Sequence, residues 1–132
     1  MFSEITFPIF IFGDGDCIVL LRREDVGREL EHYDVNDGVY IGYDYNGRPL
    51  EFSVDEDMVV GCMVADSSVR HDELLRLLHT RLSDLDYCSY DKSDDSITKA
   101  MAIGIYAETN FECQSFFGWL RSIFPRGKGK TQ

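Results

Sequence analysis

The sequence predicts an α+β domain with an antiparallel sheet of about five to six strands, built from hairpins, and two to three helices packed mainly on one face. Short apolar segments rich in β-branched and aromatic residues recur along the chain, and short turns join most of them. Segments with helical apolar spacing lie between them, and the turns are too short for the crossovers of a parallel, doubly wound sheet. We therefore expect a single domain over residues 1–125 and a basic, disordered tail at 126–132.

The first elements are a hairpin and a short helix. Residues 5–12 and 17–21 are apolar, and the Gly-Asp-Gly-Asp segment between them predicts a turn. From Glu24 to Tyr33, apolar residues recur at helical spacing with acids between them, which predicts an amphipathic helix.

The segment Val39–Val54 predicts a hairpin with a defined register. Asn46-Gly47 favours a two-residue type I′ turn, which places Tyr43 opposite Leu50. One face of the hairpin is then apolar on both strands. The other face is expected to be solvated, and it carries Tyr40, Asp44, Glu51 and Ser53.

The second half of the chain predicts two more strands around a helix. Met58–Ala65 and Ile97–Tyr106 have the composition of strands. Between them, Asp66-Ser67-Ser68 supplies N-cap candidates for a helix over Val69–Leu82. Its buried side is expected to carry Leu74, Leu75, Leu78, Leu82 and Leu85.

A capping box at Thr109 and Glu112 begins a final predicted helix, which ends before Pro125. Apolar residues occupy this helix nearly all the way round. It therefore either lies deep in the fold or presents aromatic side chains to a partner. Self-association of the chain is one form of the second alternative, through Phe116, Phe117 and Trp119.

The charge of the chain is distributed unevenly. The whole chain of 132 residues has a net charge of −11, yet residues 1–120 hold all 24 acids and only nine of the 13 Lys and Arg, a net charge of −15. A surface this negative repels nucleic acid and anionic membranes, and it attracts cationic partners over roughly 8 Å at physiological salt. We therefore expect a basic protein partner, with no nucleic acid and no membrane.

The apolar run near the N-terminus has no basic flank and contains Pro8, which favours a strand in a cytoplasmic protein over a signal peptide.

The chemical motifs of most enzyme classes are missing. Four scattered cysteines and three histidines fit no metal-site spacing, and no nucleotide or nucleophile motif occurs. We expect no metal, no cofactor and no catalytic residue.

The segment Asp84–Ser96 is the strongest candidate for a binding site. It is predicted to be an acidic loop, and its simplest alternative explanation is a solvated connection. Tyrosine gives contact area at low entropic cost, while carboxylates bond to Lys and Arg. The candidate residues in the loop are Asp84, Asp86, Tyr87, Tyr90, Asp91, Asp94 and Asp95, and Tyr40, Asp44 and Glu51 on the hairpin have the same mixture.

These observations predict a small acidic binding module that neutralises or regulates a basic protein. Its sharpest version is an immunity or antitoxin protein against a nuclease-type toxin, whose phosphate-binding groove is basic. One alternative is an enzyme or a small-ligand domain with a pocket between the sheet and the terminal helix. The other is a self-associating structural protein, so a monomer and a homodimer both remain open.

Overall fold

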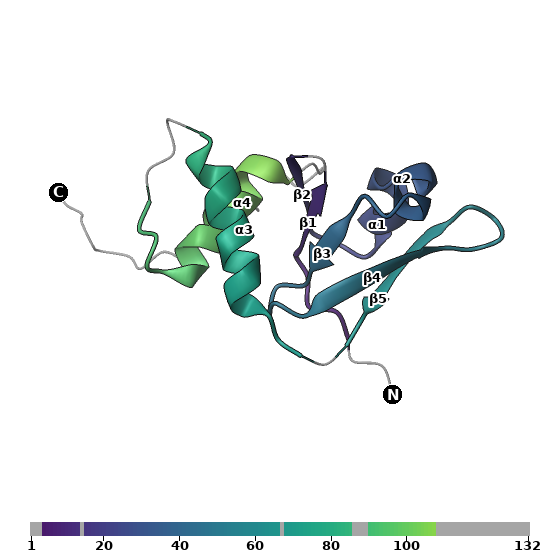
Figure 1. The fold of residues 1–132 in the computed structure, drawn as a ribbon, viewed down its shortest axis with the longest axis horizontal. Helices are drawn as coiled ribbons and strands as arrows, with labels where there is room; N and C mark the ends of the chain where they lie inside the picture. The colour runs from purple at the N-terminus through teal and green to yellow at the C-terminus, as the bar shows by residue number, and fades with distance from the viewer. Residues whose placement is uncertain (1–3, 14, 67, 86–89, 108–132) are drawn as a thin grey trace.

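A computed structural model describes residues 4–13, 15–66, 68–85 and 90–107. These residues form one five-stranded antiparallel sheet, in the order β2-β1-β3-β4-β5, and four helices, so the predicted α+β class is confirmed (Figure 1). The strands are β1 (Ile9–Gly13), β2 (Asp16–Leu20), β3 (Ile41–Tyr43), β4 (Pro49–Val54) and β5 (Val60–Val64). The helices are α1 (Glu24–Glu29), α2 (His32–Asn36), α3 (His71–Ser83) and α4 (Asp95–Tyr106).

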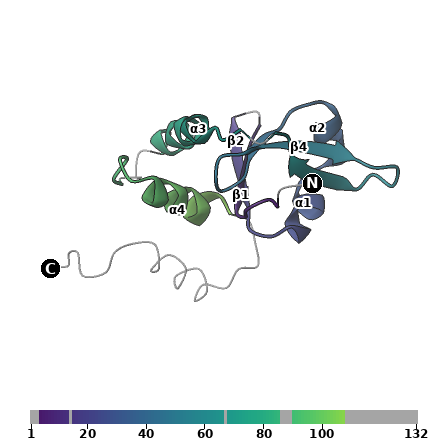
Figure 2. The same cartoon turned by 90° about the horizontal axis from the view of Figure 1, so that it is seen from below.

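The sheet is covered by helices on both faces, whereas the sequence analysis expected them mainly on one. Phe10 and Phe12 of β1 pack with the leucines of α3 and with Ile103 of α4. Ile9 and Ile11 point to the other face, in a cluster that includes Val26 of α1. Figures 1 and 2 show the α3–α4 pair on one side of the sheet and α1 and α2 on the other. Because β1 is apolar at successive positions, its burial requires cover on both faces.

The register of the β3–β4 hairpin differs by one residue from the prediction. Tyr43 pairs with Pro49, and Gly42 pairs with Leu50. The Asp44 N–H donates to the Arg48 carbonyl at 3.0 Å, which closes a three-residue loop in which Gly47 has φ 86°. Three-residue hairpin loops of this kind consist of a type I turn followed by one residue with positive φ, which is Gly47 here. A type I′ turn would need positive φ at two residues. The two-residue type I′ prediction is therefore wrong.

The shorter helices also differ from the prediction. The predicted helix Glu24–Tyr33 is broken into α1 and α2, because Leu30 and Glu31 have extended backbone. The predicted strand Ile97–Tyr106 is wrong, since these residues belong to α4. The Asp94 side chain accepts hydrogen bonds from the Ser96 and Ile97 N–H groups and so caps that helix.

The helix predicted over Val69–Leu82 is confirmed as α3, with Leu74, Leu75, Leu78 and Leu82 buried, whereas Leu85 lies beyond the helix and is only partly buried. The helix predicted from Asn110 to Phe124 and the tail at 126–132 lie outside the described residues, as do Phe116, Phe117 and Trp119. Within the described part of the chain, no helix has both the length and the apolar character needed to cross a membrane.

Candidate functional site

The described part of the predicted acidic loop is tied to the protein by local contacts. Asp94 caps α4, and Asp91 accepts hydrogen bonds from the N–H and hydroxyl of Ser93, which lower the pKa of the Asp91 carboxyl. The Tyr90 hydroxyl lies 2.8 Å from Nδ1 of His79 on α3, and the two rings are stacked 6.0 Å apart. These contacts account for part of the loop by structure alone.

Three carboxylates of this segment remain exposed to solvent: Asp84, Asp91 and Asp95. Asp95 lies in the first turn of α4, with a carboxylate oxygen 3.7 Å from Nδ1 of His71. Asp86 and Tyr87 lie outside the described residues. Residues 71–106 contain seven acids and four basic residues, so their net charge is only −3.

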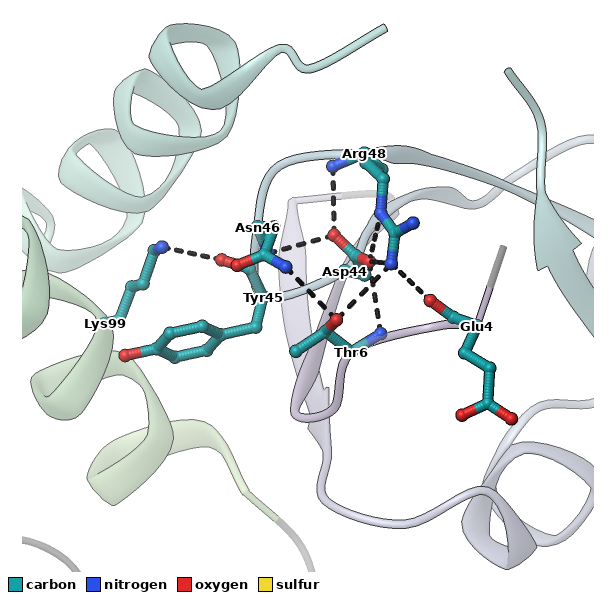
Figure 3. Close-up of polar contacts among 7 residues, drawn as sticks. All are labelled: Glu4, Thr6, Asp44, Tyr45, Asn46, Arg48 and Lys99. Carbon is teal, nitrogen blue, oxygen red and sulfur yellow. Dashed lines mark hydrogen bonds and ion pairs between the residues drawn. The ribbon is translucent and has the colours of Figure 1, made fainter. Parts of the chain in front are cut away.

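Asp44 is buried, so the prediction that it lies on a solvated face is wrong. Its side chain has no exposed surface and forms an ion pair with Arg48, 2.7 Å between Oδ2 and Nη2 (Figure 3). The same carboxylate accepts hydrogen bonds from the N–H groups of Thr6, Asn46 and Arg48. Because the loop has three residues, Asp44 turns inward to hold the loop and the N-terminal segment together. Its role is structural.

Tyr40 and Glu51 lie together at a surface hollow of about 440 Å³. The Tyr40 ring meets the Phe52 ring edge to face at 6.2 Å, and its hydroxyl donates to Asp34 Oδ2 at 3.2 Å. Burial and the adjacent Asp34 carboxylate raise the pKa of Tyr40. The described residues that line the hollow are Val35, Gly38, Tyr40, Leu50, Glu51, Phe52 and Ala65, and none of them is basic.

The hollow lies in the most acidic part of the chain. Residues 29–60 contain nine acids and a single Lys or Arg, Arg48, which is already paired with the buried Asp44. Helix α2 and the β4–β5 turn lie at the same end of the molecule (Figure 1). We call the hollow and the exposed acids around it the α2–β4 surface; the acids are Glu31, Asp37, Glu51, Asp55, Glu56 and Asp57.

Exposed apolar side chains also occur on the strands that flank β4 and in the β4–β5 turn. Ile41 is 56% exposed, Met58 59%, Val59 54% and Met63 43%, and all four belong to β3, β5 or the turn before β5. Exposed apolar groups beside an acidic rim are typical of a protein interface. In the sequence, the α2–β4 surface is marked by the shortage of basic residues over a long span. A short run of acids does not reveal that shortage.

A second concavity, of about 610 Å³, lies between β2 and the ends of α3 and α4. Cys17, Arg81, Asp84 and Tyr106 are among its lining residues. Nε of Arg81 is buried, and it has no hydrogen-bond partner among the described residues. Burial raises the pKa of Cys17 to about 12, which disfavours a reactive thiolate. Within the described residues, no group of three or more His, Cys, Asp or Glu side chains is placed to hold a metal ion.

Comparison of the sequence with protein-family models finds no match, and neither a curated protein nor a solved structure matches this chain.

Proposed function

We propose that this protein is a small acidic binding module, without catalytic activity, that neutralises or regulates a basic protein partner. The observation that carries the proposal is the hollow lined by Tyr40 and Glu51, within a span of nine acids and one basic residue. The α2–β4 surface is the primary binding surface in this proposal. Asp84, Asp91 and Asp95 form a secondary acidic surface.

In this proposal, the charged groups raise the association rate and the apolar groups supply buried contact area. Uncompensated carboxylates steer a cationic partner to the surface and raise the association rate. The apolar floor of Tyr40 and Phe52 then supplies area that is desolvated on contact, because both side chains are only partly buried in the free protein. The Glu51 carboxylate is exposed on the opposite face of β4 from Phe52, where it can form an ion pair with an arginine or lysine of the partner.

The sharpest form of the proposal is an immunity or antitoxin protein for a nuclease-type toxin. Such a toxin needs a basic groove to hold the phosphates of its substrate. An acidic surface is complementary to that groove in charge, and its exposed apolar groups add area that loses water on contact. In this form, the protein inhibits the nuclease by occupying the groove.

The test is affinity capture of the tagged chain from the cells that encode it, at low and at high salt, with each captured protein identified and then purified. We expect a basic protein that is retained at low salt and weakened at high salt. A nuclease whose activity falls to zero at one equivalent of this chain establishes the immunity form. Recovery of acidic proteins only, or of none, contradicts the whole proposal.

A matched pair of charge reversals assigns the surface. Glu51→Lys reverses an exposed carboxylate at the hollow, and Asp84→Lys reverses one at the end of α3. We expect Glu51→Lys to abolish capture at low salt and Asp84→Lys to weaken it only slightly. Equal losses from both variants contradict the choice of the α2–β4 surface.

The second candidate function is small-ligand binding or catalysis in the concavity beside β2. The buried, unpartnered Nε of Arg81 favours it, because an anionic group of a ligand could accept that hydrogen bond. A screen of anionic metabolites by thermal shift tests this candidate, with Arg81→Met as the control. A stabilising ligand that loses its effect in Arg81→Met supports it, and no stabilising ligand contradicts it.

A further inference from the structure

The outer edge of β5 is unprotected by the usual devices. β5 is the last strand of the sheet, and its sequence Val-Gly-Cys-Met-Val contains no charged residue and no proline. Natural edge strands are usually blunted by charges, prolines or bulges, because a free edge pairs with other chains. An apolar edge without these devices is suited to receive another strand.

The register shows which backbone groups point outward. Ala65 N–H donates to the Pro49 carbonyl at 2.8 Å, and Asp55 N–H donates to the Val59 carbonyl at 3.0 Å. In an antiparallel pair, hydrogen-bonded positions alternate with positions whose backbone groups face away from the partner strand. The N–H and carbonyl groups of Val60, Cys62 and Val64 therefore point away from β4.

The two ends of this edge differ. Helix α1 packs near Val60, where a Cβ on Gly27 would lie 3.7 Å from the Val60 carbonyl oxygen. Cys62 and Val64 are thus the outward-facing positions farther from α1. Among the described residues, no segment other than β4 pairs with Cys62 and Val64, so we place the open edge at these two residues.

Charge around the open edge defines the occupant. The acids Asp55, Glu56 and Asp57 precede β5, and the exposed Asp66 follows it. On one face of the sheet, Glu51 pairs with Met63 of β5, so a neighbouring strand on that face would lie roughly 10 Å from Glu51, within reach of a lysine side chain. On the opposite face, Cys62 pairs with Phe52, and both side chains pack in the apolar cluster that includes Val26 of α1.

We propose that β5 receives an extended segment of the basic partner as a sixth strand, with cations on the Glu51 face and apolar residues on the Cys62 face. This inference rests on the proposed function and names how the partner docks. Backbone hydrogen bonds at Cys62 and Val64 supply the pairing, while the side chains of these two residues supply apolar contact on the face opposite Glu51.

The test uses hydrogen exchange of the full chain, followed by NMR, with a capped heptapeptide of alternating lysine and valine as the probe. We expect the amides of Cys62 and Val64 to exchange at least tenfold more slowly when the peptide is bound. One control peptide carries glutamate in place of lysine. A second keeps the lysines but has N-methyl groups on alternate residues, which block strand pairing at unchanged charge. Protection with the first peptide and with neither control supports the inference.

The other outcomes separate the inference from the proposed function. If the lysine peptide shifts resonances of the α2–β4 surface without protecting the two amides, strand addition is wrong and the binding function stands. If it does not bind at low salt, both are contradicted. Equal protection by the glutamate peptide overturns the charge assignment. Protection that exists before any peptide is added, and that rises with protein concentration, shows that a second copy of this chain occupies the edge and overturns the inference.

A variant gives an independent measurement. Cys62→Pro removes an outward N–H and leaves the β4–β5 hydrogen bonds in place, whereas Cys62→Ala keeps the edge intact. We expect Cys62→Pro to lower affinity for the lysine peptide at least fivefold and Cys62→Ala to leave it unchanged. Folding of each variant is checked by circular dichroism. If Cys62→Pro does not fold, exchange in the wild-type chain still decides the question.

Discussion

The two acidic regions of this molecule use their carboxylates differently. In residues 71–106, Asp91 and Asp94 accept local hydrogen bonds, and four basic residues offset much of the charge. In residues 29–60, Asp44 is buried with Arg48, and Asp55 accepts hydrogen bonds from the N–H groups of Asp57 and Val59. Among the described residues, the exposed acids Glu31, Asp37, Glu51, Glu56 and Asp57 form no ion pair with a lysine or arginine. The density of aspartates in a short segment is therefore a poor guide to the electric field. Local hydrogen bonds and neighbouring cations decide how much charge a surface offers to a partner.

The largest expected effect comes from Asp44, the buried acid of residues 29–60. Asp44→Asn leaves the Arg48 guanidinium without its charge partner in a largely buried site. We expect a loss of about 3 to 5 kcal/mol in the free energy of unfolding. Urea denaturation followed by circular dichroism measures it. The control is Glu51→Gln, which alters an exposed acid and should change stability by less than about 0.5 kcal/mol. Equal losses in the two variants would remove the distinction between buried and exposed acids.

The next effect compares the two exposed surfaces directly. One triple variant combines Asp55→Asn, Glu56→Gln and Asp57→Asn, and the other combines Asp84→Asn, Asp91→Asn and Asp95→Asn, so each removes three charges. Three exposed ion pairs of about 0.5 kcal/mol each correspond to roughly tenfold in affinity. We expect a loss of this size for poly-arginine at low salt in the first variant, and a smaller loss in the second. Fluorescence titration measures both. A larger loss in the second variant would show that the α3–α4 region is the main binding surface.

A smaller effect tests whether the acids of residues 84–95 are structural. Asp94→Ala removes the cap of α4 and should lower stability by about 1 kcal/mol, because two N–H groups lose their acceptor. Asp91→Ala alters an exposed turn in the same segment, and we expect a change below about 0.5 kcal/mol. Thermal and urea unfolding measure both variants. The explanation fails if removal of Asp94 has no larger effect than removal of Asp91.

The smallest effect concerns the reactivity of Cys17, and it tests whether the concavity beside β2 holds an activated thiol. Because burial raises the pKa of Cys17 to about 12, its thiolate fraction should still be rising at pH 10. We expect alkylation of Cys17 by iodoacetamide to accelerate about tenfold per pH unit from pH 7 to 10, since only the thiolate reacts. Peptide mapping by mass spectrometry follows this residue separately from the other cysteines. A rate that levels off below pH 9 would indicate an activated thiol and favour an enzyme.

Much of the fold was predictable, because amphipathic periodicity depends on local spacing. The apolar, β-branched composition of β1, β2 and β5 predicts strands, and the spacing of the leucines in α3 predicts a helix. The strand predicted at residues 97–106 failed because small and β-branched residues there, such as Ala100 and Ile103, fit either structure. The Asp94 cap stabilises a helix, but Asp94 lies within the segment for which the sequence predicts a loop.

The candidate site was less predictable, because it depends on the tertiary structure. A register shift of one residue buried Asp44, although Tyr40 and Glu51 still line one hollow. The approach of α2 to β4, which forms that hollow, joins segments whose contact no local pattern indicates.

The position of β1 has a consequence for synthesis of the protein on the ribosome. Its residue Phe10 is fully buried in the finished fold, yet α4, the last described helix in the apolar cluster of Phe10, ends at Tyr106. At about 5–20 residues per second, this strand spends roughly 5–20 seconds outside or within the exit tunnel before its cover has been made. An apolar strand that is synthesised early and covered late is a natural target for chaperones during translation.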